Sequence, residues 1–225
     1  MDDAKKIIVA LDYDNLDSVT NFVDSIDSEL CRVKIGKELF TKYGPSIVKN
    51  IHEKGFEIFL DLKFHDIPTT VYKACISAFS LNIWMLNVHL TGGFDMSVAA
   101  MKAKQDCQST SKLIGVTALT SLSDDDCIKI YGCKRIDQLK RLRDIGLEAD
   151  IDGFVCSPYD INTLAVEDKI FVTPGIRTNN NTQDHHKVIT PVDALQLGST
   201  YLVIGRSITE SPDPIKALKE IYQSL

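Results

Sequence analysis

The chain has 225 residues, 44% apolar and 25% charged, a composition typical of one ordinary folded domain rather than a disordered or fibrous chain. Its 31 acidic and 25 basic residues leave a formal charge of −6, which excludes an overall basic field that would attract nucleic acid or an anionic membrane. The first apolar run spans five residues and ends at Asp12, too short for a signal peptide or a membrane span. We therefore expect a cytoplasmic protein that binds any anionic ligand locally.

Short apolar runs rich in β-branched residues recur along the chain, and each is followed by a longer stretch with helical spacing. These expected strands number eight and span residues 6–12, 31–36, 57–63, 85–90, 113–119, 153–157, 170–175 and 201–205. The helices expected between and after them include 16–26, 37–55, 68–79, 94–104, 136–146 and 212–225. Eight such units of about 28 residues predict an α/β protein, a (β/α)8 TIM barrel that forms a single domain over residues 1–225. An open doubly wound sheet is the main alternative, but it usually opens with a glycine-rich turn, which the first strand lacks.

The six cysteines form no CxxC pair, so neither a disulfide framework nor a zinc site is expected. We expect reduced, mostly buried thiols. One long polar stretch, residues 177–188, is predicted to be a mobile loop. It follows the seventh strand, at the barrel face where ligands bind. This position favours a functional loop over a surface loop without a function.

Charged residues gather where the first three strands end, and active sites of (β/α)8 barrels are built at such ends. The first strand ends with Asp12, the second carries Lys34, and the third carries Asp61 and Lys63, with Asp66 in the loop that follows. Asp61 and Lys63 are two residues apart, so both are expected on the same face of the strand. Isolated surface salt bridges would explain any one pair, but the four residues Lys34, Asp61, Lys63 and Asp66 on neighbouring strands favour a catalytic cluster.

The seventh and eighth expected strands end in Pro174-Gly175-Ile176-Arg177 and Ile204-Gly205-Arg206. Glycines let backbone N–H groups approach an anion, and arginines supply permanently charged donors. The two ends together predict a phosphate site, whereas turn glycines with solvated arginines are the alternative. Elsewhere, His89 lacks a second histidine at ligand spacing, and Cys156 and Ser157 lack a local base motif. We expect these three residues to pack or to form hydrogen bonds.

The motifs of the chain resemble those of the bacterial orotidine 5'-phosphate decarboxylase family over nearly its whole length. The matching segments are ALD at 10–12, VKIG at 33–36, DLKFHDIPTT at 61–70, TALTS at 117–121, VCS at 155–157, VTPGIR at 172–177 and YLVIGRSIT at 201–209. The resemblance implies decarboxylation of orotidine 5'-monophosphate to UMP and CO2 in pyrimidine biosynthesis, with no metal or organic cofactor.

The resemblance also implies roles for individual residues. Lys63 is the expected proton donor, within a catalytic network of Lys34, Asp61 and Asp66. The residues expected on the ribose or pyrimidine are Asp12, Lys34, Asp61, Ile67, Thr70 and Thr120, and those expected around the phosphate are Pro174, Arg177, Gly205 and Arg206. Counting back from Thr190-Pro191 puts His185 at the place of the family's phosphate-binding glutamine, with Gln183 two residues earlier.

The family also implies a homodimer whose active sites are shared. Asp66, Ile67 and Thr70 would then enter the partner's site, whereas the local alternative is that Asp66 caps the helix that Pro68 begins. Two rival functions use a similar barrel. A pentose-phosphate epimerase or hexulose-phosphate synthase is one, although an epimerase would need more metal-binding residues at strand ends than His89. A non-catalytic nucleotide-binding barrel is the other, and the presence of Lys63 disfavours it.

Overall fold

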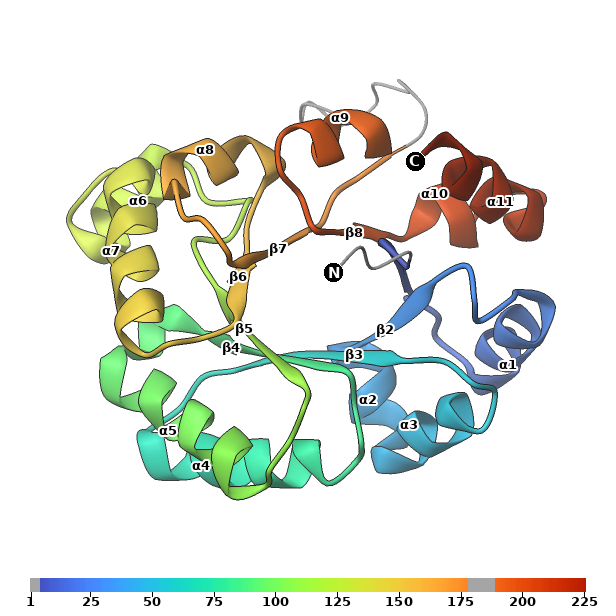
Figure 1. The fold of residues 1–225 in the computed structure, drawn as a ribbon, viewed down its shortest axis with the longest axis horizontal. Helices are drawn as coiled ribbons and strands as arrows, with labels where there is room; N and C mark the ends of the chain where they lie inside the picture. The colour runs from blue at the N-terminus through green and yellow to red at the C-terminus, as the bar shows by residue number, and fades with distance from the viewer. Residues whose placement is uncertain (1–4, 178–188) are drawn as a thin grey trace. The chain divides into compact units, whose positions relative to one another are not determined.

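The computed structural model describes residues 5–177 and 189–225 (Figure 1). Eight parallel strands follow one another as neighbours in chain order and close into a barrel, so the predicted (β/α)8 fold is confirmed. The strands are β1 (Ile7–Ala10), β2 (Arg32–Gly36), β3 (Ile58–Phe64), β4 (Met85–His89), β5 (Lys112–Val116), β6 (Gly153–Val155), β7 (Ile170–Thr173) and β8 (Tyr201–Ile204). All eight predicted strands are present, with ends that differ by at most three residues.

Contacts divide the chain into a first unit, residues 1–61 with 173–225, and a second unit, residues 62–172. One domain over residues 1–225 stays a prediction. In the first unit, β1 pairs with both β2 and β8, with Val9 beside Val33 and Ile204. All four residues of β1 and of β8 are buried, as expected for parallel strands covered on both faces.

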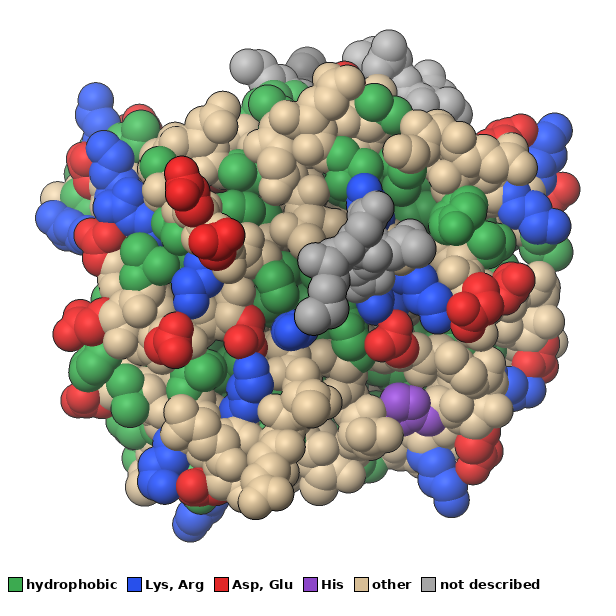
Figure 2. Space-filling model, viewed as in Figure 1, with side chains coloured by type: hydrophobic (Ala, Val, Ile, Leu, Met, Phe, Trp, Pro, Cys, Tyr) green, Lys and Arg blue, Asp and Glu red, His purple; other side chains and the backbone are tan. Residues whose placement is uncertain are grey.

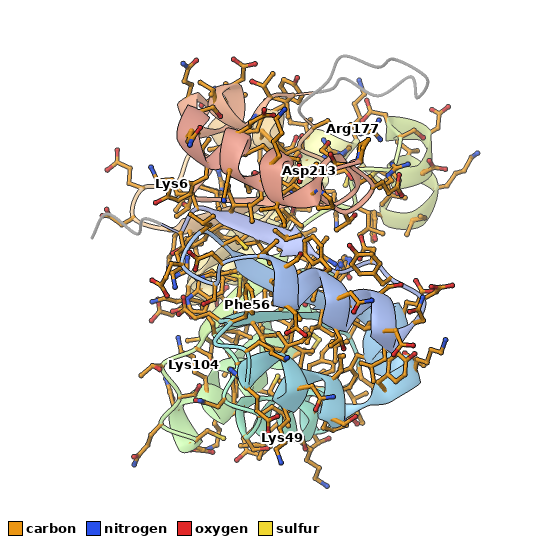
Figure 3. All side chains as sticks on the ribbon, turned by 90° about the vertical axis from the view of Figure 1, so that its right-hand side faces the viewer. Lys6, Lys49, Phe56, Lys104, Arg177 and Asp213 are labelled. Atoms are coloured by element: carbon orange, nitrogen blue, oxygen red, sulfur yellow. The ribbon has the colours of Figure 1, made fainter. Side chains whose placement is uncertain are left out.

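The helices of the first unit are α1 (Leu16–Ser25), α2 (Lys37–Tyr43), α3 (Pro45–His52), α9 (Pro191–Gln196), α10 (Arg206–Thr209) and α11 (Pro214–Ser224). Helix α1 begins where the Asn15 side chain accepts the Ser18 N–H, and its residues Val19, Phe22 and Val23 form one buried stripe. In Figure 3 the buried ring of Phe56 lies under the ribbon of this unit, whereas Lys49 of α3 lies at its surface.

The single helix predicted over residues 37–55 is wrong, because two helices occupy this segment. Gly44 ends α2 with a φ of 59°, a left-handed conformation that favours glycine, and Pro45 begins α3. The proline ring also disfavours a helical conformation at the residue before it. Gly44-Pro45 therefore turns the chain between two short helices.

The second unit contains the end of β3 and the strands β4 to β7 as far as Val172. Its helices are α4 (Pro68–Phe79), α5 (Phe94–Asp106), α6 (Asp124–Tyr131), α7 (Arg135–Glu148) and α8 (Ile161–Leu164), with short 3-10 turns at Leu90–Gly92 and Pro158–Asp160. Helices α4 and α5 run side by side (Figure 1). Leu139 and Leu142 of α7 pack with Phe154 and Phe171 in a buried apolar core. Helices α6, α8 and α10 were not among the helices expected from the sequence pattern.

Acidic and basic side chains are mixed over the face seen in Figure 2, consistent with the small net charge. Four of the six cysteines are buried, which confirms the expectation that most of them lie in the interior. In the part of the chain with assigned structure, none of the helices combines the length and apolarity needed to cross a membrane.

Candidate active site

In the first unit, the ammonium of Lys34 lies between two carboxylates. Its Nζ atom is 3.4 Å from Asp12 Oδ1 and 3.5 Å from Asp61 Oδ2. The Lys34 and Asp61 side chains are 10% and 12% exposed, whereas Asp12 is 62% exposed. A nearly buried cation beside a nearly buried anion avoids the cost of an isolated buried charge. The structure thus brings together Lys34 and Asp61 of the predicted charged cluster, and it places Asp12 beside the same ammonium.

The strand register explains why the side chains of Lys34 and Asp61 lie close together. Lys34 of β2 lies beside Ala10 of β1 and Phe59 of β3, and Gly36 lies beside Asp61. A Cβ atom on Gly36 would come within 3.2 Å of Lys34 Nζ, a tight contact, so glycine leaves room for the ammonium. A Cβ atom on Gly205 would lie 3.6 Å from Asp12 Oδ2, so the residue after β8 is close to the same cluster.

The predicted phosphate-binding residues follow β7 and β8. Gly175 has a φ of 81°, which a residue with a side chain rarely adopts. The backbone N–H of Arg177 donates to Ile189 O at 3.1 Å, which anchors the chain at this arginine. Arg206 is the first residue of α10 and is exposed. Residues 178–188, with the predicted mobile loop, Gln183 and His185, lie outside the described residues.

In the second unit, Lys63 lies on β3, two residues after Asp61, but its backbone is not extended. Its φ is 52°, in the left-handed region, so the alternation of side chains along a strand does not set its direction. The expectation that Lys63 and Asp61 share a face by alternation therefore rested on a backbone conformation that Lys63 does not have. The Lys63 N–H donates to Asn87 Oδ1 at 2.8 Å. Sequence reasoning missed Asn87, although a polar residue inside an apolar strand was a usable signal.

Hydrogen bonding of His89 is confirmed. Its Nδ1 atom lies 2.8 Å from Thr91 Oγ1, which is also 3.4 Å from Nε2 of His65, and the two histidine rings are tilted with centroids 5.5 Å apart. This network joins the segment after Lys63 to the end of β4.

Asp66, Ile67, Thr70 and Thr120 are exposed residues of the second unit, and Ile67 is 63% exposed. Helix α4 begins at Pro68 as predicted, but its N-cap is Ile67 and no side chain caps it. Asp66 Oδ1 instead accepts the N–H of Ile67 at 2.7 Å. The alternative role of Asp66 as the helix cap is therefore wrong.

A metal site would need a cluster of ligand side chains, and thiol catalysis would need a cysteine with a lowered pKa. Among the residues with assigned structure, no three His, Cys, Asp or Glu side chains gather as a metal site would require. Burial raises the pKa of the Cys156 thiol well above its usual value, because the charged thiolate loses its hydration. Cys156 is thus a buried wall residue and not an activated nucleophile.

Comparison with known proteins identifies the family. A family model described as "Orotidine 5'-phosphate decarboxylase / HUMPS family" matches residues 5–221. The chain belongs to this family. It is 46% identical to the orotidine 5'-phosphate decarboxylase of Shewanella sediminis over 98% of this chain and 97% of that protein. Identity is also 46% to the Saccharophagus degradans protein of the same name, over 96% and 93% of the two chains.

Two solved structures share the fold of this chain. The crystal structure of orotidine 5'-phosphate decarboxylase from Lactobacillus acidophilus matches with a TM-score of 0.85 and 33% identity, over 97% of this chain and 98% of that one. An uncharacterized conserved protein from Geobacillus kaustophilus matches with a TM-score of 0.81 and 30% identity, over 96% and 98% of the two chains. The resemblance seen in the sequence motifs is confirmed.

Proposed function

We propose that this member of the orotidine 5'-phosphate decarboxylase family converts orotidine 5'-monophosphate to UMP and CO2, a step of pyrimidine biosynthesis. The names of its full-length relatives support this substrate. The observation that carries the proposal is the nearly buried Lys34 to Asp61 ion pair on strands β2 and β3, with Lys63 two residues further along β3. Such a paired charge cluster at strand ends is suited to a reaction in which charge develops on the substrate.

The chemistry explains why a lysine is needed. When the bond from pyrimidine carbon 6 to the carboxylate breaks, its electron pair stays on carbon 6, in the plane of the ring, where the π system cannot take it up. In our proposal the Lys63 ammonium stabilises this charge and transfers one proton to carbon 6. Solvent then returns a proton to the amine. Lys34 and Asp61 complete the charged surroundings of the reacting carbon, and the Asp12 carboxylate binds the ribose.

The rest of the substrate is bound by groups at the other strand ends. Thr120, after β5, binds the pyrimidine. Pro174, Arg177, Gly205 and Arg206 surround the phosphate, for which permanently charged arginines and accessible backbone N–H groups are suitable donors. His185 is a further phosphate ligand in this proposal. Binding energy from the remote phosphate favours closure of the site and exclusion of water around the charges.

The proposed active form is a homodimer in which the partner chain contributes residues to each active site. Asp66, Ile67 and Thr70 precede or begin α4, and all three are exposed. An isoleucine that is 63% exposed next to an exposed carboxylate is suited to a contact with another chain. These three residues therefore complete the partner's cluster of Lys34, Asp61 and Lys63.

A spectrophotometric assay of orotidylate loss tests the proposal. The purified protein should convert orotidylate to equal amounts of UMP and CO2, and treatment with EDTA should not change the rate. Lys63→Ala should nearly abolish turnover while UMP still binds. Lys49→Ala, which removes a surface lysine of α3, is the matched control and should retain full activity. The role of Lys63 would be untenable if its variant kept turnover within about tenfold of the parent, a loss near 1.4 kcal/mol.

A further inference from the structure

The backbone of Lys63 has an unusual conformation for a residue within a strand. Its φ is 52°, and among the residues with assigned structure five other non-glycine residues have positive φ, at positions 82, 108, 150, 165 and 168. Those five lie in turns, bends or segments after helices, whereas Lys63 is inside β3. A left-handed conformation is sterically unfavourable for a residue with a Cβ atom, so it persists only where the surroundings hold it.

One buried side chain supplies such a hold. The Lys63 N–H donates to Asn87 Oδ1 at 2.8 Å, and Asn87 is completely buried in the middle of β4. A buried amide is costly unless it is hydrogen-bonded, and a backbone N–H turned out of the sheet ladder needs a new acceptor. This hydrogen bond satisfies the Lys63 N–H and the side-chain oxygen of Asn87.

The next residues of the same segment are also joined to β4. Thr91 Oγ1 lies 3.4 Å from His65 Nε2 and 2.8 Å from His89 Nδ1. Asn87 holds the backbone of Lys63, and Thr91 contacts the ring two residues later. The segment that carries Lys63 thus has two attachments, one to Asn87 of β4 and one to Thr91 in the turn that follows β4, and the one to Asn87 is directly on Lys63.

We propose that Asn87 is a positioning residue for Lys63: its amide oxygen holds the left-handed peptide of Lys63 and so sets where the lysine ammonium meets the substrate. The inference rests on the proposed function, because it gives Asn87 its role through the proton donor. Relaxation of Lys63 to an extended backbone would redirect its side chain by far more than the fraction of an ångström that proton transfer tolerates.

The positioning role predicts a specific kinetic pattern. Asn87→Leu has a similar size and no acceptor, and we expect kcat to fall roughly 10- to 100-fold while the KM for orotidylate and the Kd for UMP change by less than about threefold. Asn87→Asp keeps an acceptor at the same position and should recover kcat to within about tenfold of the parent. Ser111→Ala is the matched control, because it removes a buried hydrogen bond from the Ser111 hydroxyl to Ile83 O at the start of β5. It should leave kcat unchanged.

A double-mutant comparison separates positioning from general loss of structure. In a Lys63→Ala background, Asn87→Leu should not lower the residual rate further, because the group that it positions is already absent. An equal additional loss in both backgrounds would overturn the inference, and so would an Asn87→Leu variant that keeps the parental kcat. If Lys63→Ala itself stays active, the proposed role of Lys63 fails, and the assay identifies that failure independently of Asn87.

The unsubstituted protein offers a test that does not depend on the folding of any variant. With ¹⁵N-lysine labelling, the Lys63 amide should exchange its hydrogen much more slowly than the same lysine in an unstructured peptide of the same local sequence. Rapid exchange of the Lys63 amide, at the rate of an unprotected peptide, would show that Asn87 does not hold it.

Discussion

Lys34 Nζ lies 3.5 Å from Asp61 Oδ2, and both side chains are nearly buried. The same ammonium lies 3.4 Å from Asp12, whose side chain is mostly exposed. The two ion pairs of Lys34 therefore differ in their surroundings more than in their length. Water screens the pair with Asp12, and it screens the pair with Asp61 much less.

This difference predicts unequal effects on stability. Lys34→Met removes the ammonium beside the nearly buried Asp61 carboxylate and should lower the free energy of unfolding by ~3 kcal/mol or more. Asp12→Asn removes an exposed partner and should cost less than ~1 kcal/mol. Chemical denaturation of the parent and the two variants measures both values. Equal losses would show that burial does not distinguish the two pairs.

The arginine after β7 should discriminate ligands with a phosphate from those without one. Arg177→Ala should weaken UMP binding roughly 10- to 100-fold, because a charge-assisted hydrogen bond contributes about 1.5–3 kcal/mol, and should change uridine binding by less than about threefold. Isothermal titration with both ligands measures this. Arg141→Ala, at an exposed position of α7, is the control. A similar loss for UMP and uridine would remove Arg177 from the phosphate site.

The proposed homodimer with shared active sites predicts complementation between inactive subunits. Lys63→Ala mixed with Asp66→Ala should recover about a quarter of the parental activity, because half of the dimers are mixed and each mixed dimer has one intact site. Lys63→Ala mixed with Lys34→Ala should recover nothing, since both residues belong to the same chain's part of the site. Native mass spectrometry verifies subunit exchange. Absence of recovery in the first mixture after verified exchange would restrict Asp66 to its own chain.

Gly153, the first residue of β6, is predicted to tolerate no side chain. A Cβ atom there would come within 2.1 Å of the backbone oxygen of Ile170, and the backbone of β7 cannot move aside without loss of pairing. Gly153→Ala should therefore destabilise the protein by ~3 kcal/mol or more, the upper range for overpacking. Gly132→Ala places a Cβ atom in open space at a φ of 70° and should cost only ~1 kcal/mol. Thermal unfolding compares the two variants.

Helices α4 and α5 are joined by a pH-sensitive contact. A hydrogen bond from Lys102, which has the larger effect, and a second one from Tyr72 lower the pKa of Asp106 below its ordinary value of 3.8. A lowered pKa in the folded state means that this stabilisation is present above the unfolded pKa and is lost as the pH falls through the folded pKa. Tyr72→Phe should raise the pKa of Asp106 in an NMR titration. Asp126, whose pKa is lowered by Ser123, is the internal control and should not respond.

Helix ends and contacts between strand ends were predicted from the sequence with different success. Helix α4 was predicted with its correct ends, because Pro68 marks its start and a local apolar pattern continues to Phe79. The segment 37–55 was predicted as one helix because the helical spacing continues across Gly44-Pro45. Lys34 and Asp61 were expected in one charged cluster with Lys63 and Asp66, and the structure places their side chains 3.5 Å apart, since parallel strands bring their carboxyl ends to one edge of a sheet.

The sequence by itself determined the alternation of buried strands and amphipathic helices, and the charged residues at the ends of the strands. These features depend on neighbours two to four residues apart, which a linear pattern records. Only the tertiary structure decided the left-handed backbone of Lys63 and its attachment to Asn87, 24 residues away on another strand. A backbone conformation that is unfavourable locally is stable only when a distant acceptor is already in place, and no local pattern encodes that acceptor.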